Sequence, residues 1–260
     1  MLQGVCKARG TGHIAGMEDG RGDGYRVGPL ARQARREDGV AAFLDAVRRA
    51  PPAVSANAPR LVFALDATMS RQPTWDLACR VQGGMFEAAA EAGGLQIQLV
   101  YFRGMGECAA SRFVADPRAL TGLMAKVACR GGHTQIGRVL RHVRDLHASE
   151  PVRTFVLVGD AMEERLDDLC AVAGELGLLG IKGFLFHEDD DPAAVGAFRE
   201  IARLTGGASA RFDASAPHAL AGLLRAAAAY AARGVEGLRL AARTNADARR
   251  LLASMGPVAP

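Results

Sequence analysis

Five side chains that carry oxygen atoms lie where buried strands are expected to end. They are two carboxylates and three hydroxyls: Asp66, Thr68, Ser70, Thr134 and Asp160. The first three alternate along the chain, so an extended or turning backbone can point them in the same direction. Oxygen atoms are the ligands that a hard divalent cation prefers, and Mg²⁺ usually keeps several water molecules beside them. The pattern therefore predicts a site for Mg²⁺, in which Mn²⁺ can take its place.

The segments that position these residues alternate between strand and helix. Strands are predicted over 61–65, 95–102, 107–114, 154–158, 181–186 and 208–212. Apolar residues at helical spacing predict helices over 74–92, 135–147, 162–178, 192–204 and 216–231, and Asp116-Pro117 predicts the start of another. This alternation predicts an α/β fold, a doubly wound and mostly parallel six-stranded sheet with helices on both faces.

Two local features refine this prediction. The tight turn at 104–106 implies antiparallel pairing, so segment 107–114 is expected to form an antiparallel edge strand. Glu163 and Glu164 lie near the start of the predicted helix 162–178, where acidic residues interact favourably with the helix dipole.

Ligands of an open α/β sheet bind outside the carboxyl ends of strands, where the strand order reverses. If the first and fourth strands are neighbours at that point, the five oxygen donors meet in one crevice.

The donors resemble the metal-ion-dependent adhesion site (MIDAS) of the von Willebrand factor A (VWA) family, which has a Rossmann-like fold. The family pattern is Asp-x-Ser-x-Ser, then a distant threonine, then an aspartate after the fourth strand. The chain has Asp66-x-Thr68-x-Ser70, followed by Thr134 and Asp160. Thr68 keeps the hydroxyl of the commoner serine. The resemblance covers roughly residues 60–232, including the order of strands and helices.

The resemblance implies a role for each residue and for the domain. Thr68, Ser70 and Thr134 would contact the metal directly or through water, and Asp66 and Asp160 often act through water. The domain would be a bacterial-type adaptor or scaffold without enzymatic activity. Its Mg²⁺ would capture an Asp or Glu of a partner protein.

Two alternatives stay open at this point. The chain could be a non-catalytic subunit of a chelatase-like or ATPase-associated complex, with an ATPase subunit as its partner. A hydrolase built on Ser70, His133 and Asp160 is less favoured, because the serine is not in a GxSxG turn.

Composition excludes several other classes. The formal net charge is +4, without a block of lysine or arginine, which argues against a nucleic-acid partner. No apolar run approaches the ~20 residues of a transmembrane helix, which argues against a membrane partner. The five cysteines are odd in number and lack CxxC spacing. Together with an N-terminus that lacks the apolar stretch of a signal peptide, they favour a cytoplasmic location.

Four regions are predicted along the chain. Residues 1–35, rich in Gly and Arg, are expected to form a disordered arm, and residues 36–59 a short helix and a linker. Residues 60–232 form the VWA-like domain. Residues 233–260 form a C-terminal tail with a possible weak amphipathic helix ending at Leu251 and Leu252.

Overall fold

The computed structural model describes residues 58–90, 94–188, 190–213 and 215–255, which belong to one unit, Asp38–Pro260. The predicted arm over 1–35 lies outside the described residues. So does the predicted short helix and linker over 36–59, apart from its last two residues.

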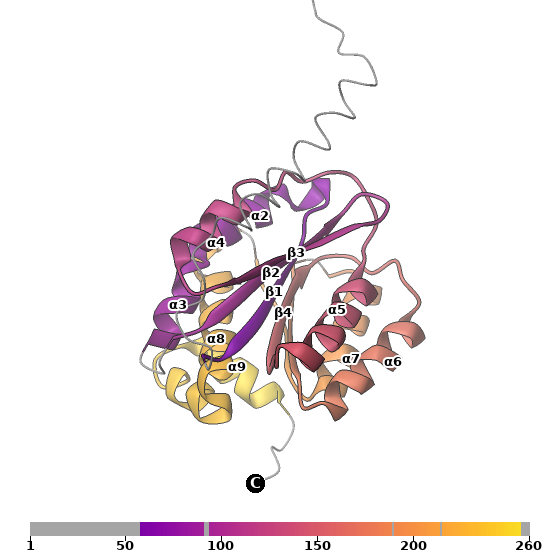
Figure 1. Cartoon of the computed structure of the whole chain (residues 1–260). Helices are drawn as coiled ribbons and strands as arrows, with labels where there is room; N and C mark the ends of the chain where they lie inside the picture. Colours follow the sequence, from indigo (N-terminus) through magenta and orange to yellow (C-terminus); the bar gives the residue numbers. More distant parts are fainter. Residues whose placement is uncertain (1–57, 91–93, 189, 214, 256–260) are drawn as a thin grey trace, which may run out of the picture. The chain divides into compact units, whose positions relative to one another are not determined.

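Six strands form a single sheet in the order β3-β2-β1-β4-β5-β6 (Figure 1). They are β1 (Arg60–Asp66), β2 (Gln96–Arg103), β3 (Glu107–Val114), β4 (Thr154–Gly159), β5 (Lys182–His187) and β6 (Ala208–Arg211). All neighbouring strands pair in parallel except β2 and β3, so the antiparallel edge strand is confirmed. The strand order reverses between β1 and β4, which are neighbours as the crevice required.

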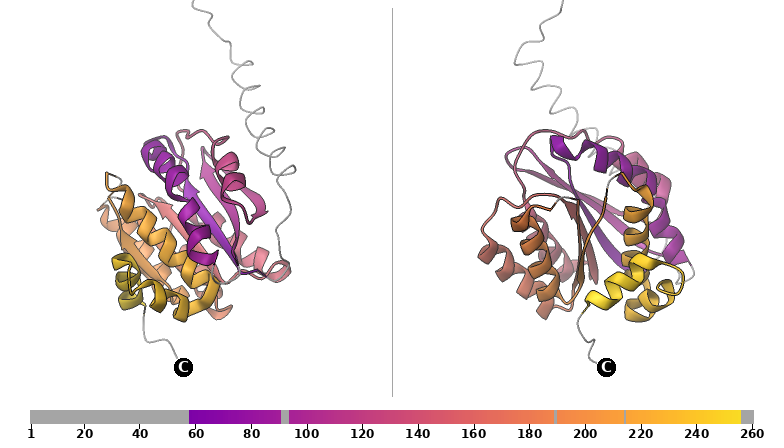
Figure 2. Two further views of the ribbon diagram at one scale, coloured as in Figure 1. Left: turned by 90° about the vertical axis from the view of Figure 1, so that its left-hand side faces the viewer. Right: turned by 180° about the vertical axis from the view of Figure 1, so that it is seen from behind.

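Helices cover both faces of this sheet (Figure 2). They are α2 (Gln72–Val81), α3 (Gly83–Ala90), α4 (Pro117–Met124), α5 (Ile136–Ser149), α6 (Leu166–Leu178), α7 (Pro192–Thr205), α8 (Pro217–Ala241) and α9 (Ala246–Ser254), with a 3₁₀ turn η1 (Met69–Arg71). Alternate residues of β1 belong to two separate hydrophobic cores. Phe63 belongs to the core on the side of α2, α3, α4, α8 and α9, and Val62 to the core on the side of α5, α6 and α7. The predicted doubly wound α/β architecture is confirmed.

Two helices differ from their predicted bounds. The predicted helix 74–92 consists of α2 and α3, interrupted at Gln82, whose side-chain amide donates to the Pro117 carbonyl. Helix α3 packs against α8, and a Cβ on Gly84 would come within 2.7 Å of Arg225 Nε. Helix α6 begins at Leu166, four residues later than predicted, since the residues before it contact the loop that precedes α5.

The segment predicted as a tail contains the expected helix, and that helix packs on the core. Helix α9 buries Ala248 and Leu251 completely, and α8 extends past residue 232 to Ala241. In the structure, packed residues therefore continue to Met255, which is also buried. Within the part of the chain that the structure describes, no helix is both long and apolar enough to cross a membrane.

Candidate metal site

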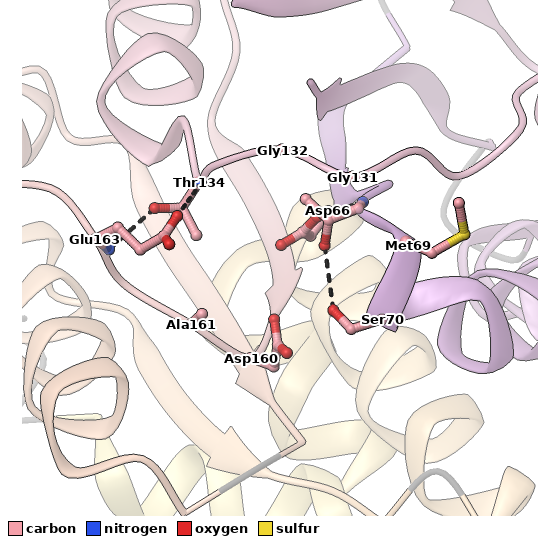
Figure 3. A pocket seen from close by; sticks show the side chains of 10 residues that line it. Asp66, Met69, Ser70, Gly131, Gly132, Thr134, Asp160, Ala161 and Glu163 are labelled. Carbon is pink, nitrogen blue, oxygen red and sulfur yellow. Dashed lines mark hydrogen bonds between the residues drawn. The ribbon is translucent and has the colours of Figure 1, made fainter. Parts of the chain in front are cut away.

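The five predicted metal ligands line one pocket at the carboxyl ends of β1 and β4 (Figure 3). The pocket has a volume of about 290 Å³. Its other lining residues are Met69, Gly131, Gly132, Ala161 and Glu163. Side chains from three separate segments of the chain thus meet as the strand order predicts. Whether they bind a metal remains a prediction at this stage.

The loop after β1 holds the first three donors in a fixed turn. Asp66 is the last residue of β1 and is 4% exposed. Its Oδ1 accepts a hydrogen bond of 2.7 Å from the Thr68 backbone N–H, which closes a turn over Ala67. Thr68 Oγ1 and Ser70 Oγ lie 3.4 Å apart, the latter in the turn η1. The alternation seen in the sequence thus places carboxylate and hydroxyl oxygens side by side.

Burial places the Asp66 carboxyl group in an unfavourable electrostatic environment. Loss of solvent raises its pKa to about 6, and the nearby Asp160 carboxylate adds to the rise. Hydrogen bonds from Thr68 and the charge of Arg71 act in the opposite direction. A divalent cation beside both carboxylates would favour their ionised forms, because opposite charges stabilise each other. The charge pattern of the pocket therefore suits a cation.

Asp160 forms a buried ion pair that the sequence did not predict. Arg71 Nη2 lies 3.0 Å from Asp160 Oδ2, and the two side chains are only 9% and 13% exposed. Arg71 Nη1 also pairs with Glu188, at the end of β5, and Thr74 donates a hydrogen bond to the same Glu188 oxygen. Arg71 directly follows the Asp-x-Thr-x-Ser pattern, but its sequence position does not reveal that the side chain turns inward.

Thr134 is held by Glu163 through two reciprocal hydrogen bonds. The Thr134 N–H donates to Glu163 Oε2 at 2.9 Å, and the Glu163 N–H donates to Thr134 Oγ1 at 3.0 Å (Figure 3). His133 Nδ1 lies 3.0 Å from the same carboxylate oxygen. The hydrogen bond from Thr134 is the largest effect that lowers the pKa of Glu163. Glu163 is a pocket residue that sequence reasoning did not assign to the site.

The neighbouring Glu164 caps the helix that follows Thr134. Its carboxylate accepts hydrogen bonds from the backbone N–H groups of Ile136 and Gly137. These groups have no partner within α5, because they belong to its first turn. Glu163 and Glu164, which were expected to interact favourably with the dipole of the helix 162–178, lie before α6 begins, and their carboxylates bond to Thr134 and to the first turn of α5. The sequence could not show which of two helix N-termini lies nearer.

The loop before Thr134 rests on the turn between β2 and β3. A Cβ on Gly132 would lie 2.2 Å from the backbone nitrogen of Gly104, so only glycine allows this approach. The His133 N–H donates to the Gly104 carbonyl at 3.2 Å, and the Gln135 amide donates to the Arg103 carbonyl at 3.1 Å. The antiparallel edge hairpin therefore sets the position of Thr134.

The residues present fit a hard divalent ion that is bound largely through hydroxyls and water. Among the described residues, no group of three His, Cys, Asp or Glu side chains is placed to hold a metal ion. The donors of the pocket are instead Thr68, Ser70 and Thr134 beside two carboxylates, an all-oxygen set of the kind that Mg²⁺ takes.

The contacts of the possible hydrolase triad differ from those that such a triad needs. His133 is paired with Glu163, and Asp160 is paired with Arg71. A serine hydrolase requires the acid to orient the histidine, so this geometry does not favour the hydrolase alternative.

Comparison with solved structures identifies the fold. The chain is similar to the VWA domain of SpRpn10, with a TM-score of 0.51 and 11% sequence identity over 64% of this chain and 94% of that one. It is also similar to proximal thread matrix protein 1 from the mussel byssus, solved with a zinc-occupied MIDAS motif, with a TM-score of 0.52 and 15% identity over 66% of this chain and 46% of that one.

A third similar structure is the pilus adhesin SpaC from Lactobacillus rhamnosus GG, with a TM-score of 0.51 and 12% identity over 67% of this chain and 30% of that one. No family model and no curated protein matches the sequence. The likeness to solved structures nevertheless shows a VWA fold, and it confirms the fold that the motif spacing suggested.

Proposed function

We propose that this domain binds one Mg²⁺ ion in the pocket at the ends of β1 and β4 and uses it to hold an acidic side chain of a partner protein. The observation that carries the proposal is the convergence of all five oxygen donors, from three distant segments, on one pocket. Thr68, Ser70 and Thr134 would hold the ion, and Asp66 and Asp160 would act beside them, in part through water. Mn²⁺ would be able to replace Mg²⁺.

The electrostatics of the pocket support binding of a partner's carboxylate. Hydroxyl oxygens are neutral ligands, so a divalent ion bound through them keeps positive charge at an open coordination position. One of the two carboxylates, Asp160, already shares its charge with Arg71. An anionic oxygen from outside would therefore be attracted to the ion. The domain would act as an adaptor without catalysing a reaction.

The identity of the metal can be tested on gently purified protein. Elemental analysis should find Mg²⁺, or Mn²⁺ after exchange, at about one ion per chain. Stoichiometric zinc or iron would contradict the proposed ion, although the related byssus protein was solved with zinc in its MIDAS motif.

Partner capture tests the function. The wild-type chain, Asp66→Ala and Asp145→Ala would be used as baits, each in Mg²⁺ and in EDTA. Asp145 is a matched control, because it is an exposed aspartate near the end of α5 away from the pocket. A partner should be retained in Mg²⁺ by the wild type and by Asp145→Ala only, and Mg²⁺ should reverse the effect of EDTA.

A partner that binds the wild type and Asp66→Ala equally, and does so in EDTA, would contradict the metal-bridged mechanism. The identity of a captured partner is a separate result. Recovery of an ATPase subunit would place the chain in an ATPase-associated complex, with the same pocket as its docking site.

A further inference from the structure

A buried arginine contacts one carboxylate of the candidate metal site. Arg71 ends the turn η1, one residue after the donor Ser70, and only 7% of the residue is exposed. Its guanidinium group contacts Asp160 and Glu188, with 3.0 Å between Arg71 Nη2 and Asp160 Oδ2. Figure 3 shows the Asp160 side chain on the same side of the pocket as those of Asp66 and Ser70. Arg71 therefore forms an ion pair with a carboxylate that lines the proposed metal site.

The second partner of Arg71 is itself held in place by other contacts. Glu188, its second partner, also accepts a hydrogen bond from Thr74 and donates its backbone N–H to the Gly159 carbonyl at 3.3 Å. An arginine side chain stays charged at any ordinary pH. Asp160 thus faces a permanent positive charge whose own position is held by neighbouring elements.

We propose that Arg71 is a built-in cation beside the pocket that offsets the charge of Asp160 and thereby lowers the affinity for the divalent ion. This inference rests on the proposed metal binding. The argument is one of charge. Asp66 and Asp160 line the pocket, and Glu188 is the second partner of Arg71. Together they carry three formal negative charges, and Arg71 cancels one of them. A divalent ion that enters must share Asp160 with a cation that is already present.

Such an arrangement affects both the affinity for the metal ion and the positive charge that the bound ion keeps. The ion is held less tightly than the same carboxylates would hold it without the arginine, because like charges repel through the poorly solvated interior. The bound ion is also neutralised less completely by the protein itself. A ligand from outside then contributes a larger share of the total attraction.

Isothermal titration of the 260-residue chain with Mn²⁺ alone tests the inference. Arg71→Met replaces the arginine with an unbranched apolar side chain and so removes the positive charge. The Kd for Mn²⁺ should therefore fall about tenfold. Arg71→Lys keeps the charge without the planar fork and should stay close to the wild type. Thermal unfolding in EDTA shows whether each variant is folded at the titration temperature.

A substitution at Glu188 can compensate for the charge that is lost at Arg71. Glu188→Gln alone removes a negative charge and should weaken Mn²⁺ binding. Arg71→Met combined with Glu188→Gln restores the net charge of the wild type, and its Kd should return toward the wild-type value. A structural effect of losing the ion pair would give no such return, because both partners are then missing.

Three results would overturn the inference in distinguishable ways. Arg71→Met that binds Mn²⁺ no more tightly than the wild type would show that Arg71 does not compete with the ion. Weaker binding by Arg71→Met, with normal binding by Arg71→Lys, would make Arg71 a residue that positions Asp160. The absence of Mn²⁺ binding in the wild type and in every variant would remove the proposed function itself.

Discussion

Asp66 shows what a single buried carboxylate costs in folding stability. A carboxyl group that is 4% exposed beside a second carboxylate is destabilised in its ionised form, and its pKa rises to about 6. The ordinary value of 3.8 applies to the unfolded chain, so the folded state loses stability as pH rises from about 3.8 through 6. Above that window the destabilisation is complete, and a bound cation would reverse it.

The first prediction follows from this environment. Asp66→Asn keeps a carbonyl oxygen that can accept from the Thr68 N–H and removes the buried charge. At pH 8 in EDTA, the variant should be as stable as the wild type or more stable, by on the order of 1–3 kcal/mol. Addition of Mn²⁺ should raise the melting temperature of the wild type only. Thermal unfolding with and without Mn²⁺ measures both effects, and a clearly destabilised variant in EDTA would contradict this account.

At the same scale, the sequence predicted which oxygen-bearing side chains would lie together better than it predicted the residues that contact them. Asp66, Thr68 and Ser70 could be found because their spacing is local and follows a buried strand. Arg71 and Glu163 could not, because their roles depend on contacts across 89 and 29 positions of the chain: Arg71 reaches Asp160, and Glu163 reaches Thr134. A charged side chain in a loop gives no local signal of the partner that it will meet.

At the scale of elements, the edge hairpin is the part of the fold that aligns Thr134. The turn between β2 and β3 contacts the loop at Gly132, and this contact is made by backbone atoms on the hairpin side. Backbone atoms cannot rotate away as a side chain can. The turn between β2 and β3, which contributes no donor to the pocket, thus helps to position a side chain from another segment.

The second prediction compares two adjacent glycines, one of which is crowded by neighbouring backbone atoms and one of which has open space around it. Gly132→Ala would bring a Cβ within 2.2 Å of the Gly104 nitrogen, whereas Gly131→Ala meets nothing within 4 Å. Gly132→Ala should lower the free energy of unfolding by about 1–3 kcal/mol and weaken Mn²⁺ binding, because Thr134 is displaced. Gly131→Ala should behave like the wild type. Equal Mn²⁺ affinities for the two variants would show that the loop adapts without moving the donor.

Element types were predicted from periodicity, whereas helix ends depended on contacts from elsewhere in the chain. The sequence segments that form β1 and β4 consist mainly of apolar residues, because helices cover both faces of the sheet. The predicted start of α6 was four residues too early, since Glu163 and Glu164 are bound to the segment that leads into α5. A helical pattern shows which residues can be helical, and tertiary hydrogen bonds decide where the helix begins.

For the whole molecule, the C-terminal segment closes one of the two cores. Helix α9 packs against α8 and β6 on the face that also holds α2 and α3. Its amphipathic pattern is weak over only nine residues, so the sequence alone indicated a tail. The two buried positions in it, Ala248 and Leu251, are nevertheless among the least exposed residues of the chain. A short helix needs few apolar residues when the surface that it covers is already formed.

The last prediction tests whether this helix unfolds together with the domain. Leu251 is 0% exposed in α9, and Leu178, at the end of α6, is 92% exposed. Leu251→Ala removes buried methyl groups and leaves a cavity, so it should lower the free energy of unfolding by about 2–5 kcal/mol. Leu178→Ala, the same change at the surface, should alter it by less than about 0.5 kcal/mol. Urea unfolding followed by circular dichroism compares the two variants with the wild type. A single transition at lower urea for Leu251→Ala alone would make α9 part of the cooperatively folded domain, whereas equal midpoints for all three proteins would make it a dispensable appendage.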